Sequence, residues 1–344
     1  MRRRTLLAAG AAGLAGAGAT PAFAGGRHRV VHVRPGDSVQ AAVDAVDGPG
    51  RTIVVHPGTY REVVQVPREK AELTIGGATR DPRDTVIVYD NANGTLKPDG
   101  SGTYGTAGSA TFSSAAAGLT VRDLTLANDW LRADNPEITG TQAVAAYITG
   151  DRSYFENVRL LAHQDTLFVD TTALDAFDRQ YFRRCHIEGD VDFVFGRATA
   201  VFEACRFHTL PRDVDFTPKG MVFAPSTARA NPHGILAVRS RITSGAEDGA
   251  YKLARPWVPS YETTAWPSLV VRDSRIGPGI DAVAPYTDMR EAYPWQTMRF
   301  LEYRNTGPGA VVTVPENRPR LSATEAESHT RRAYLGNWRP YERP

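Results

Sequence analysis

Phe155-Glu-Asn-Val-Arg-Leu160 and Phe182-Arg-Arg-Cys-His-Ile187 are two copies of one six-residue pattern with apolar first and last residues. The last three positions of each copy alternate inward, outward and inward, as in a half-buried strand. Each copy is therefore expected to form a short strand. Four more stretches fit the pattern, the third of them with one residue fewer: Val121-Arg-Asp-Leu-Thr-Leu126, Phe202-Glu-Ala-Cys-Arg-Phe207, Val238-Arg-Ser-Arg-Ile242 and Val271-Arg-Asp-Ser-Arg-Ile276.

The spacing of these copies favours a solenoid. They begin about 20 to 35 residues apart, and repeats of that size bury their inner faces only by stacking. The irregular period fits a propeller or a leucine-rich repeat poorly, whereas short strands joined by variable insertions are typical of a parallel β-helix. We expect an all-β solenoid of this kind with short flanking helices, a cap near residues 39–46 and an outer helix near 322–334.

The chain opens with a segment typical of protein export. Arg2-Arg3-Arg4 precedes an apolar stretch that ends in Ala22-Phe23-Ala24. These are the charged, apolar and cleavage regions of a signal peptide, and the adjacent arginines also suit the twin-arginine route. A membrane anchor is the alternative, but the stretch is short and interrupted by glycine. We expect cleavage after Ala24, a secreted protein without membrane association, and a single domain over residues 25–344.

The balance of charges gives no support for a nucleic-acid partner. The chain holds 40 Lys and Arg against 38 Asp and Glu, a net charge of +2. Residues 1–24 contain three of the basic residues and no acid, so 37 − 38 leaves −1 after cleavage. A domain that binds nucleic acid through its bulk charge would carry a clear basic excess.

The two cysteines, Cys185 and Cys205, both occupy the fourth position of a copy. Stacked strands lie about 4.8 Å apart, within the Cα–Cα range of a disulfide, and an exported protein meets oxidising conditions. We therefore expect a Cys185–Cys205 disulfide. The alternative is a pair of stacked core thiols, because Leu124 and Val158 fill the same position in other copies. Two cysteines alone do not make a metal site.

Two aspartates share an offset within neighbouring copies. Asp165 lies ten residues after Phe155, and Asp192 lies ten residues after Phe182. If each copy is one coil of a stack, the two carboxylates lie side by side on one face. Like charges that close do not both ionise readily, so one carboxyl keeps a proton. A charged carboxylate beside a protonated one is a pair suited to acid, base or nucleophilic chemistry.

Around these aspartates the chain resembles the pectinesterases, or pectin methylesterases. That family shows the patterns G-x-Y-x-E, Q-A-V-A, Q-D-T-L, D-F-I-F-G and L-G-R-P-W in this order. One such motif is a weak signal, whereas five in order are specific, and the resemblance extends over roughly residues 29–340. The matching stretches are Gly58-Thr-Tyr-Arg-Glu62, Gln142-Ala-Val-Ala145, Gln164-Asp-Thr-Leu167, Asp192-Phe-Val-Phe-Gly196 and Leu253-Ala-Arg-Pro-Trp257.

The resemblance implies a right-handed parallel β-helix that hydrolyses the methyl esters of polygalacturonate in pectin and releases methanol, with no metal or organic cofactor. By position, Asp192 matches the nucleophile, and Asp165 matches the proton donor to methanol and later the base that activates water. Gln142 and Gln164 match the donors to the oxyanion. Arg255 matches the arginine that positions the nucleophile and keeps it ionised.

Further positions match contacts to the sugar. Trp257 corresponds to an aromatic wall, and Thr106 to a substrate-contacting threonine; Gln142 and Arg255 are also expected at the substrate. The stretch from Asp170 to Asp178 is longer than in plant-like members. We expect this loop to lie at the groove and to affect access for substrate.

Three alternatives remain from the sequence alone. A pectate lyase would use a similar fold, but it needs calcium ligands from several carboxylates, and no such acidic cluster can be assembled here. A non-catalytic polysaccharide-binding β-helix would not need the full set of catalytic residues. An esterase or thioesterase acting on other acyl esters would use the same pair of carboxyl groups. Pectin is the expected partner and a monomer the expected state.

Overall fold

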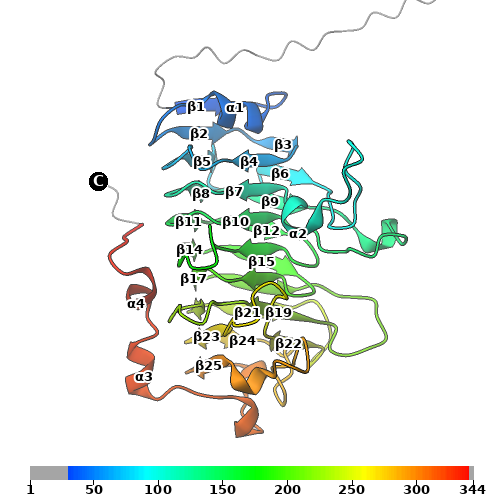
Figure 1. The fold of residues 1–344 in the computed structure, drawn as a ribbon, viewed down its shortest axis with the longest axis vertical. Coiled ribbons are helices and arrows are strands. Elements are labelled where there is room, and N and C mark those ends of the chain that lie inside the picture. Colours follow the sequence, from blue (N-terminus) through cyan, green and yellow to red (C-terminus); the bar gives the residue numbers. More distant parts are fainter. Residues whose placement is uncertain (1–29, 341–344) are drawn as a thin grey trace, which may run out of the picture.

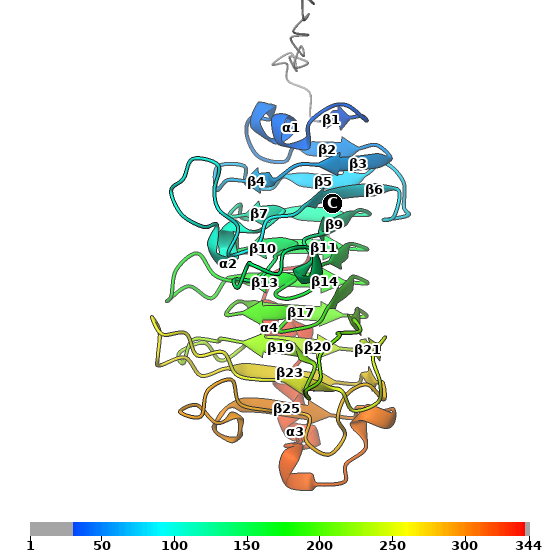
Figure 2. The ribbon, with the colours of Figure 1, turned by 90° about the vertical axis from the view of Figure 1, so that its right-hand side faces the viewer.

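The computed structural model describes residues 30–340, which form a stack of coils around one long core (Figure 1). The strands of the coils build three parallel sheets, here called A, B and C. Figure 2 shows the same stack from the side, with successive strands lying one above another. The predicted parallel β-helix is confirmed. The export signal expected at residues 1–24 lies outside the described residues, and no helix within 30–340 is long and apolar enough to cross a membrane.

The strands of each sheet follow one another along the stack. Sheet A consists of β1 (Val30–Val33), β2 (Thr52–Val55), β5 (Thr74–Gly77), β8 (Thr120–Arg122), β11 (Ser153–Glu156), β14 (Arg179–Arg183), β17 (Thr199–Glu203), β20 (Ile235–Val238), β23 (Ser268–Arg272) and β25 (Arg299–Tyr303). Sheet B consists of β3 (Gly58–Arg61), β6 (Thr85–Tyr89), β9 (Thr125–Asn128), β12 (Arg159–Leu161), β15 (His186–Gly189), β18 (Arg206–Thr209), β21 (Arg241–Ser244) and β24 (Arg275–Ile276). Sheet C consists of β4 (Val64–Val66), β7 (Phe112–Ser114), β10 (Ala146–Ile148), β13 (Leu167–Val169), β16 (Val194–Gly196), β19 (Gly220–Pro225) and β22 (Tyr251–Ala254).

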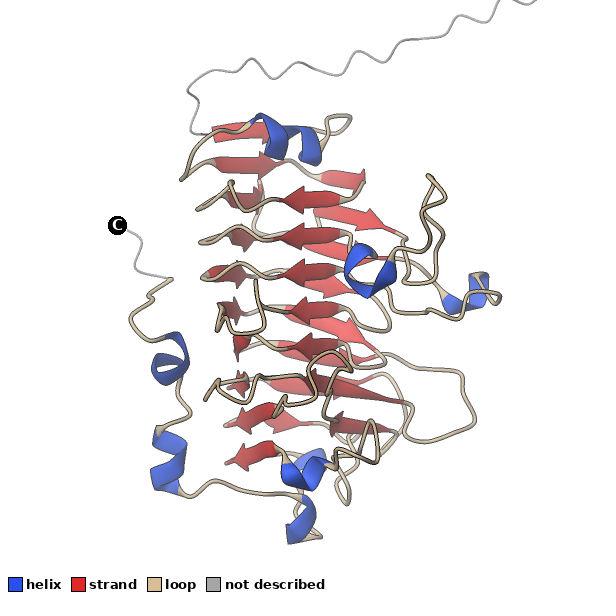
Figure 3. Cartoon of the chain, viewed as in Figure 1, coloured by secondary structure: helices blue, strands red, loops and turns tan. Residues whose placement is uncertain are grey.

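Helices are short and lie at the periphery of the stack (Figure 3). The expected cap and outer helices are both present, the outer one in two pieces. The α-helices are α1 (Val39–Ala45), α2 (Gly105–Gly108), α3 (Ala323–Glu327) and α4 (Arg331–Leu335). The 3₁₀ turns are η1 (Arg132–Asp134), η2 (Trp295–Thr297), η3 (Pro308–Ala310) and η4 (Pro315–Asn317).

One of the sequence motifs holds the N-terminal cap in place. Glu62, the last residue of the G-x-Y-x-E motif, accepts hydrogen bonds from the first backbone N–H groups of α1, those of Val39 (2.7 Å) and Gln40 (3.0 Å). The Ser38 side chain, the N-cap, accepts from the N–H of Ala41 and donates to Glu62. These bonds satisfy helix donors that have no partner inside the helix. The motif is structural at this end of the stack.

The six-residue pattern sets the register of the coils. Phe155 pairs with Phe182, and Phe182 with Phe202, so their rings stack with centroids 4.9 and 4.7 Å apart. The structure corrects the prediction that the copy at Val238 is one residue shorter. The structure pairs Ala237 with Phe202, so this copy has six residues and begins with a small residue that the pattern did not reveal.

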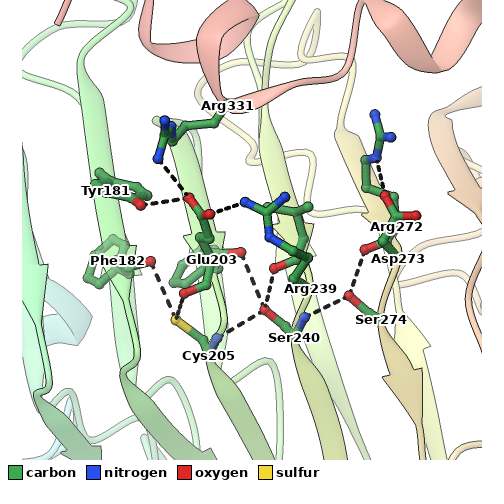
Figure 4. A network of polar contacts seen from close by, with 12 residues as sticks. Tyr181, Phe182, Glu203, Cys205, Arg239, Ser240, Arg272, Asp273, Ser274 and Arg331 are labelled. Atoms are coloured by element: carbon green, nitrogen blue, oxygen red, sulfur yellow. Dashed lines mark hydrogen bonds and ion pairs between the residues drawn. The ribbon is translucent and has the colours of Figure 1, made fainter. Parts of the chain in front are cut away.

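The structure also corrects the predicted disulfide, because Cys185 and Cys205 are both free, buried thiols. Each sulfur contacts a backbone carbonyl of the preceding coil, that of Phe155 for Cys185 (3.5 Å) and that of Phe182 for Cys205 (3.4 Å). Serines continue this position along the stack (Figure 4): the Cys205 N–H donates to the Ser240 hydroxyl at 3.1 Å. The two cysteines are therefore stacked core thiols, the alternative given above, and from Cys185 onward the position holds small side chains that bond to the backbone.

The C-terminal helices cover the outer face of sheet A. Tyr334 and Leu335 of α4 pack against apolar side chains of that face, among them Tyr181. Figure 4 shows the polar part of this contact, where Glu203 accepts a hydrogen bond from the Tyr181 hydroxyl (2.7 Å) and pairs with Arg239 and Arg331. Helix and sheet are therefore joined by apolar packing and by a shared carboxylate.

A buried ion pair closes the C-terminal end of the core. Glu302 occupies the position in β25 that Val271 occupies in β23, and it is 4% exposed. Both of its oxygens accept hydrogen bonds from Arg318 at 2.9 Å. Tyr286 and Asn305 donate to the same carboxylate at 3.1 and 3.0 Å. A buried carboxylate is tolerated here because every partner is in place.

We predict that Arg318→Met lowers the free energy of unfolding by about 3–5 kcal/mol, because it leaves a buried carboxylate without its cation. The matched control is Arg304→Met, whose side chain is 70% exposed in its pair with Asp273; it should change stability by less than about 1 kcal/mol. Urea unfolding of both variants measures the difference. An Arg318→Met protein that unfolds at the same urea concentration as the control would contradict this account.

Candidate active site

The candidate site is a groove of ≈ 400 Å³ on the outer face of sheet C. Insertions between sheets B and C form one wall, including the loop with α2, and the segments after β22 and β24 contribute the other. All seven residues predicted for the site line this groove or its floor. The lining residues are Thr106, Gln142, Gln164, Asp165, Phe168, Asp192, Phe195, Ala224, Arg255, Trp257, Tyr261 and Met289.

The coil register places the two aspartates at equivalent positions. Leu167 pairs with Val194, and each aspartate lies two residues before its member of that pair. Both have left-handed backbone, with φ of +66° at Asp165 and +49° at Asp192. The N–H of Asp165 donates to the carbonyl of Val191 at 3.0 Å. The carboxylates therefore lie on adjacent coils at one height of the groove floor, as the shared offset predicts.

The loop between the two aspartates does not disturb this stacking. Residues 170–178 contain no strand and connect β13 directly to β14. None of them lines the groove, contrary to expectation; Leu174 and Phe177 line a separate hollow beside it. The loop reaches the groove indirectly, because Asp170 pairs with Arg197 at 3.0 Å, and Arg197 lies over the ring of Tyr261.

Asp192 is held by a two-pronged contact with Arg255. The guanidinium Nε lies 2.9 and 3.1 Å from the two carboxylate oxygens, and a terminal nitrogen lies 2.6 Å from Oδ2. Asp192 is 6% exposed. Burial raises the pKa of Asp192, and the charge and hydrogen bonds of Arg255 oppose that rise. The arginine thus favours the ionised form of a carboxyl that burial alone would neutralise.

Asp165 has the same burial without such a contact. Burial raises the pKa of Asp165 well above its ordinary value, the negative charge of Asp192 raises it further, and Arg255 opposes this only through its charge. Within residues 30–340 no ion pair involves the Asp165 carboxylate. Of the two coupled carboxyl groups, Asp165 is therefore the one that retains a proton.

Two neutral side chains fix the glutamine amides. The carbonyl oxygen of Gln164 accepts from the Thr141 hydroxyl at 2.7 Å, and that of Gln142 accepts from the Asn93 amide at 2.8 Å. The same Asn93 nitrogen donates to the Thr106 hydroxyl at 3.2 Å. With both oxygens engaged, the NH₂ groups of the glutamines are left to donate into the groove. Asn93 and Thr141 carried no signal in the sequence, because they lie outside the motifs.

Aromatic side chains form one side of the groove. Phe168 and Phe195 stack at a centroid distance of 4.2 Å, and Trp257 stands tilted against both, at 5.8 and 5.6 Å. Phe193, in contrast, faces the core. The sequence did not indicate the lining residues Tyr261, Met289 and Ala224. Tyr261 and Met289 come from loops without a recognisable pattern, and Ala224 lies in β19, outside the motifs.

Two further features bear on the chemistry. His163 lies outside the groove lining, with Nδ1 3.5 Å from Asp190 Oδ2. Burial lowers the pKa of His163. Within residues 30–340 there is no group of three His, Cys, Asp or Glu side chains placed to hold a metal ion. The ionisable groups at the centre of the groove are thus two carboxyls and an arginine.

Comparison with known proteins gives a consistent result. The model of the pectinesterase family matches residues 35–338. A pectinesterase of Ralstonia solanacearum is 35% identical over 310 residues, covering 79% of this chain and 76% of that protein. Pectin methylesterase PemA from Erwinia chrysanthemi superposes with a TM-score of 0.78 at 28% identity, covering 90% and 98% of the two chains. A pectin methylesterase solved in complex with a hexasaccharide gives 0.77 at 29% identity, covering 88% and 94%. The chain therefore belongs to the pectinesterases, a family of carboxylic ester hydrolases.

Proposed function

We propose that the groove hydrolyses methyl esters of polygalacturonate, with Asp192 as nucleophile and Asp165 as general acid and then base. The observation that carries the proposal is the unequal environment of two stacked carboxyls, one gripped by Arg255 and the other buried without a cation. A nucleophile must be charged and a proton donor must be protonated. The hexasaccharide bound to a related pectin methylesterase supports a sugar-chain substrate for this groove.

The first half-reaction forms an acyl-enzyme. An oxygen of Asp192 attacks the carbon of the methyl ester, and the carbonyl oxygen becomes an oxyanion. The amide groups of Gln142 and Gln164 donate to that oxyanion, and loss of one such donor typically costs about 100- to 1000-fold in rate. The bond to the methoxy group then breaks as Asp165 gives up its proton, so methanol leaves and an anhydride with Asp192 remains.

The second half-reaction returns the enzyme to its starting state. Asp165, now ionised, takes a proton from water as the oxygen of that water attacks the galacturonyl carbon. The bond to Asp192 breaks, and the aspartate leaves as a carboxylate beside Arg255. The product is a galacturonate carboxyl group, and Asp165 again holds its proton. The sum is ester plus water giving acid plus methanol.

Around this chemistry we propose a secreted, monomeric enzyme with a single domain over residues 25–344. The charged, apolar and cleavage regions within residues 1–24 support export. N-terminal sequencing of protein from the culture medium tests this, and a mature chain that still begins at Met1 would contradict it.

We predict that Asp192→Ala reduces methanol release from methylated pectin by at least about 10⁴-fold, because the covalent route loses its nucleophile. The control is Asp175→Ala, an exposed aspartate of the 170–178 loop, which should retain normal activity. Methanol is measured for both variants alongside their thermal unfolding. A folded Asp192→Ala enzyme with activity near that of the control would refute the assignment.

The pH profile of activity should be bell-shaped. At low pH activity falls as Asp192 takes up a proton, and at high pH it falls as Asp165 loses the proton that methanol needs. The pKa of Asp165 is raised well above 3.8. The loss of activity on the high-pH side should therefore occur at a higher pH than the pKa of an ordinary aspartate would give. Initial rates of methanol release across pH give the profile. Activity that stays constant down to strongly acidic pH would exclude a carboxylate nucleophile.

The buried carboxyl of Asp165 is needed for the proposed activity, but it should lower the stability of the folded enzyme at neutral pH. The folded pKa of Asp165 is raised, so the native state binds a proton that the unfolded state releases, and stability is lost as pH rises through that pKa. Asp165→Asn removes this loss. We expect the variant to be inactive yet more stable than the wild type at neutral pH.

The stability gain should shrink as pH falls from the folded pKa of Asp165 towards about 4, and it should vanish below about 4, where the aspartate is protonated in both the folded and the unfolded state. Thermal unfolding of both proteins at several pH values, with Asp175→Asn as control, measures it. A variant that is less stable than the wild type at neutral pH would show that the buried Asp165 carboxyl does not lower the stability of the folded protein.

A further inference from the structure

We propose a second, non-catalytic binding site on the outer face of sheet B, for segments of polygalacturonate that have already lost their methyl esters. The identity of this ligand rests on the proposed function; the site itself rests on the observations that follow. One outward position carries a basic residue on five consecutive strands. These residues, here called the basic column, are Arg159, His186, Arg206, Arg241 and Arg275.

The column is continuous and faces solvent. Each of its residues is directly followed in sequence by a core residue, such as Leu160 or Ile242, so the basic side chains point away from the core. Arg206, Arg241 and Arg275 are exposed, and the other two are partly exposed. Neighbouring coils lie about 4.8 Å apart, which sets the spacing between successive charges.

Such a column opposes folding unless something offsets it, because like charges directly opposite on neighbouring strands are destabilising. On sheet A, by contrast, Arg183 pairs with Glu156 of the adjacent coil at 2.7 Å. The four arginines of the column have no carboxylate within ion-pair distance among residues 30–340.

The column's internal polar contacts are few. Arg206 donates to the Thr243 hydroxyl at 3.0 Å, and His186 contacts Glu188 at 2.8 Å. The chain as a whole is nearly neutral, at +2. The column is therefore not part of a general basic excess of the chain.

A shallow, open hollow lies at the Arg159 end of the column. It measures ≈ 600 Å³ and its rim includes Arg80, Arg83, Arg159, Arg184 and His186. Its one acid, Asp81, is already bonded to Arg83. The loop that carries Arg80 is fixed to the stack, since the Asn157 amide donates to the Arg80 carbonyl at 2.8 Å. The column therefore begins in a concave, basic surface.

The shape and charge fit a linear polyanion with one carboxylate on every repeating unit. Arginine binds carboxylates through two parallel hydrogen bonds, and the column offers such groups at regular intervals. Methylated pectin lacks these charges, whereas the product of the groove has them. None of the column residues lines the groove on sheet C. A product segment on sheet B would thus hold the enzyme on a partly processed chain while the groove stays open to remaining esters.

The test compares two triple variants with equal changes in charge. Arg159→Gln/Arg206→Gln/Arg241→Gln removes three of the column's four arginines, and Arg34→Gln/Arg68→Gln/Arg320→Gln removes three exposed arginines elsewhere. Affinity electrophoresis in ester-free polygalacturonate gives the dissociation constants. The column variant should bind about tenfold more weakly, since three exposed ion pairs are each worth little; the control variant should bind like the wild type. Wild-type binding should weaken with salt.

Two further readouts separate the possibilities. Both variants should release methanol from short methylated oligogalacturonides at the wild-type rate, and the column variant should be at least as heat-stable as the wild type. If the wild-type protein released no methanol, the proposed function would be refuted, but the comparison of polygalacturonate binding between the variants could still be interpreted. The proposal is overturned if the column variant binds polygalacturonate as the wild type does, if the control loses as much, or if the column binds duplex DNA or anionic vesicles more tightly.

Discussion

Two aspartates on adjacent coils share one position of the register, and the stack holds their carboxyls side by side, largely out of water. Burial and mutual repulsion raise the cost of a second negative charge, so simultaneous ionisation of both carboxyls is disfavoured. Of the two carboxyls, the described part of the chain pairs Asp192 with Arg255, which favours the negative charge on Asp192. The division of roles in the proposed mechanism follows from this asymmetry.

The same register explains much of the rest of the molecule. Because each coil repeats the one before it, a side chain stacks on its equivalent: phenylalanines in the core, small polar groups in the Cys205–Ser240 ladder, and arginines on sheet B. Apolar stacking stabilises the fold, whereas stacking of like charges costs stability. Where like charges do stack, at the aspartate pair and along the basic column, we infer function.

The sequence predicted the features that recur at the same position from coil to coil. The six-residue copies indicated the β-helix, and the common offset of Asp165 and Asp192 indicated their proximity. It failed where a position departs from its equivalents. Ala237 was hidden by its small side chain, and the core carboxylate of Glu302 can be understood only from Arg318, which comes from another segment.

Contacts between loops could likewise not be predicted from the sequence. Asn93 and Thr141 orient the glutamine amides from separate insertions, and no spacing rule connects them. The disulfide expected from the stacked cysteines is not formed, and each thiol contacts a backbone carbonyl of the preceding coil. The position of the 170–178 loop between the aspartates predicted that it lies at the groove. In the structure its side chains line a separate hollow.

The proposed mechanism requires that the pair of carboxyls holds one proton at neutral pH and that Asp165 carries it. Isotope-edited infrared spectroscopy of protein with ¹³C-labelled aspartate detects protonated carboxyl groups directly. We predict a protonated carboxyl band at pH 7 in the wild type that disappears in Asp165→Asn. A wild-type spectrum without such a band, or one that Asp165→Asn leaves unchanged, would contradict it.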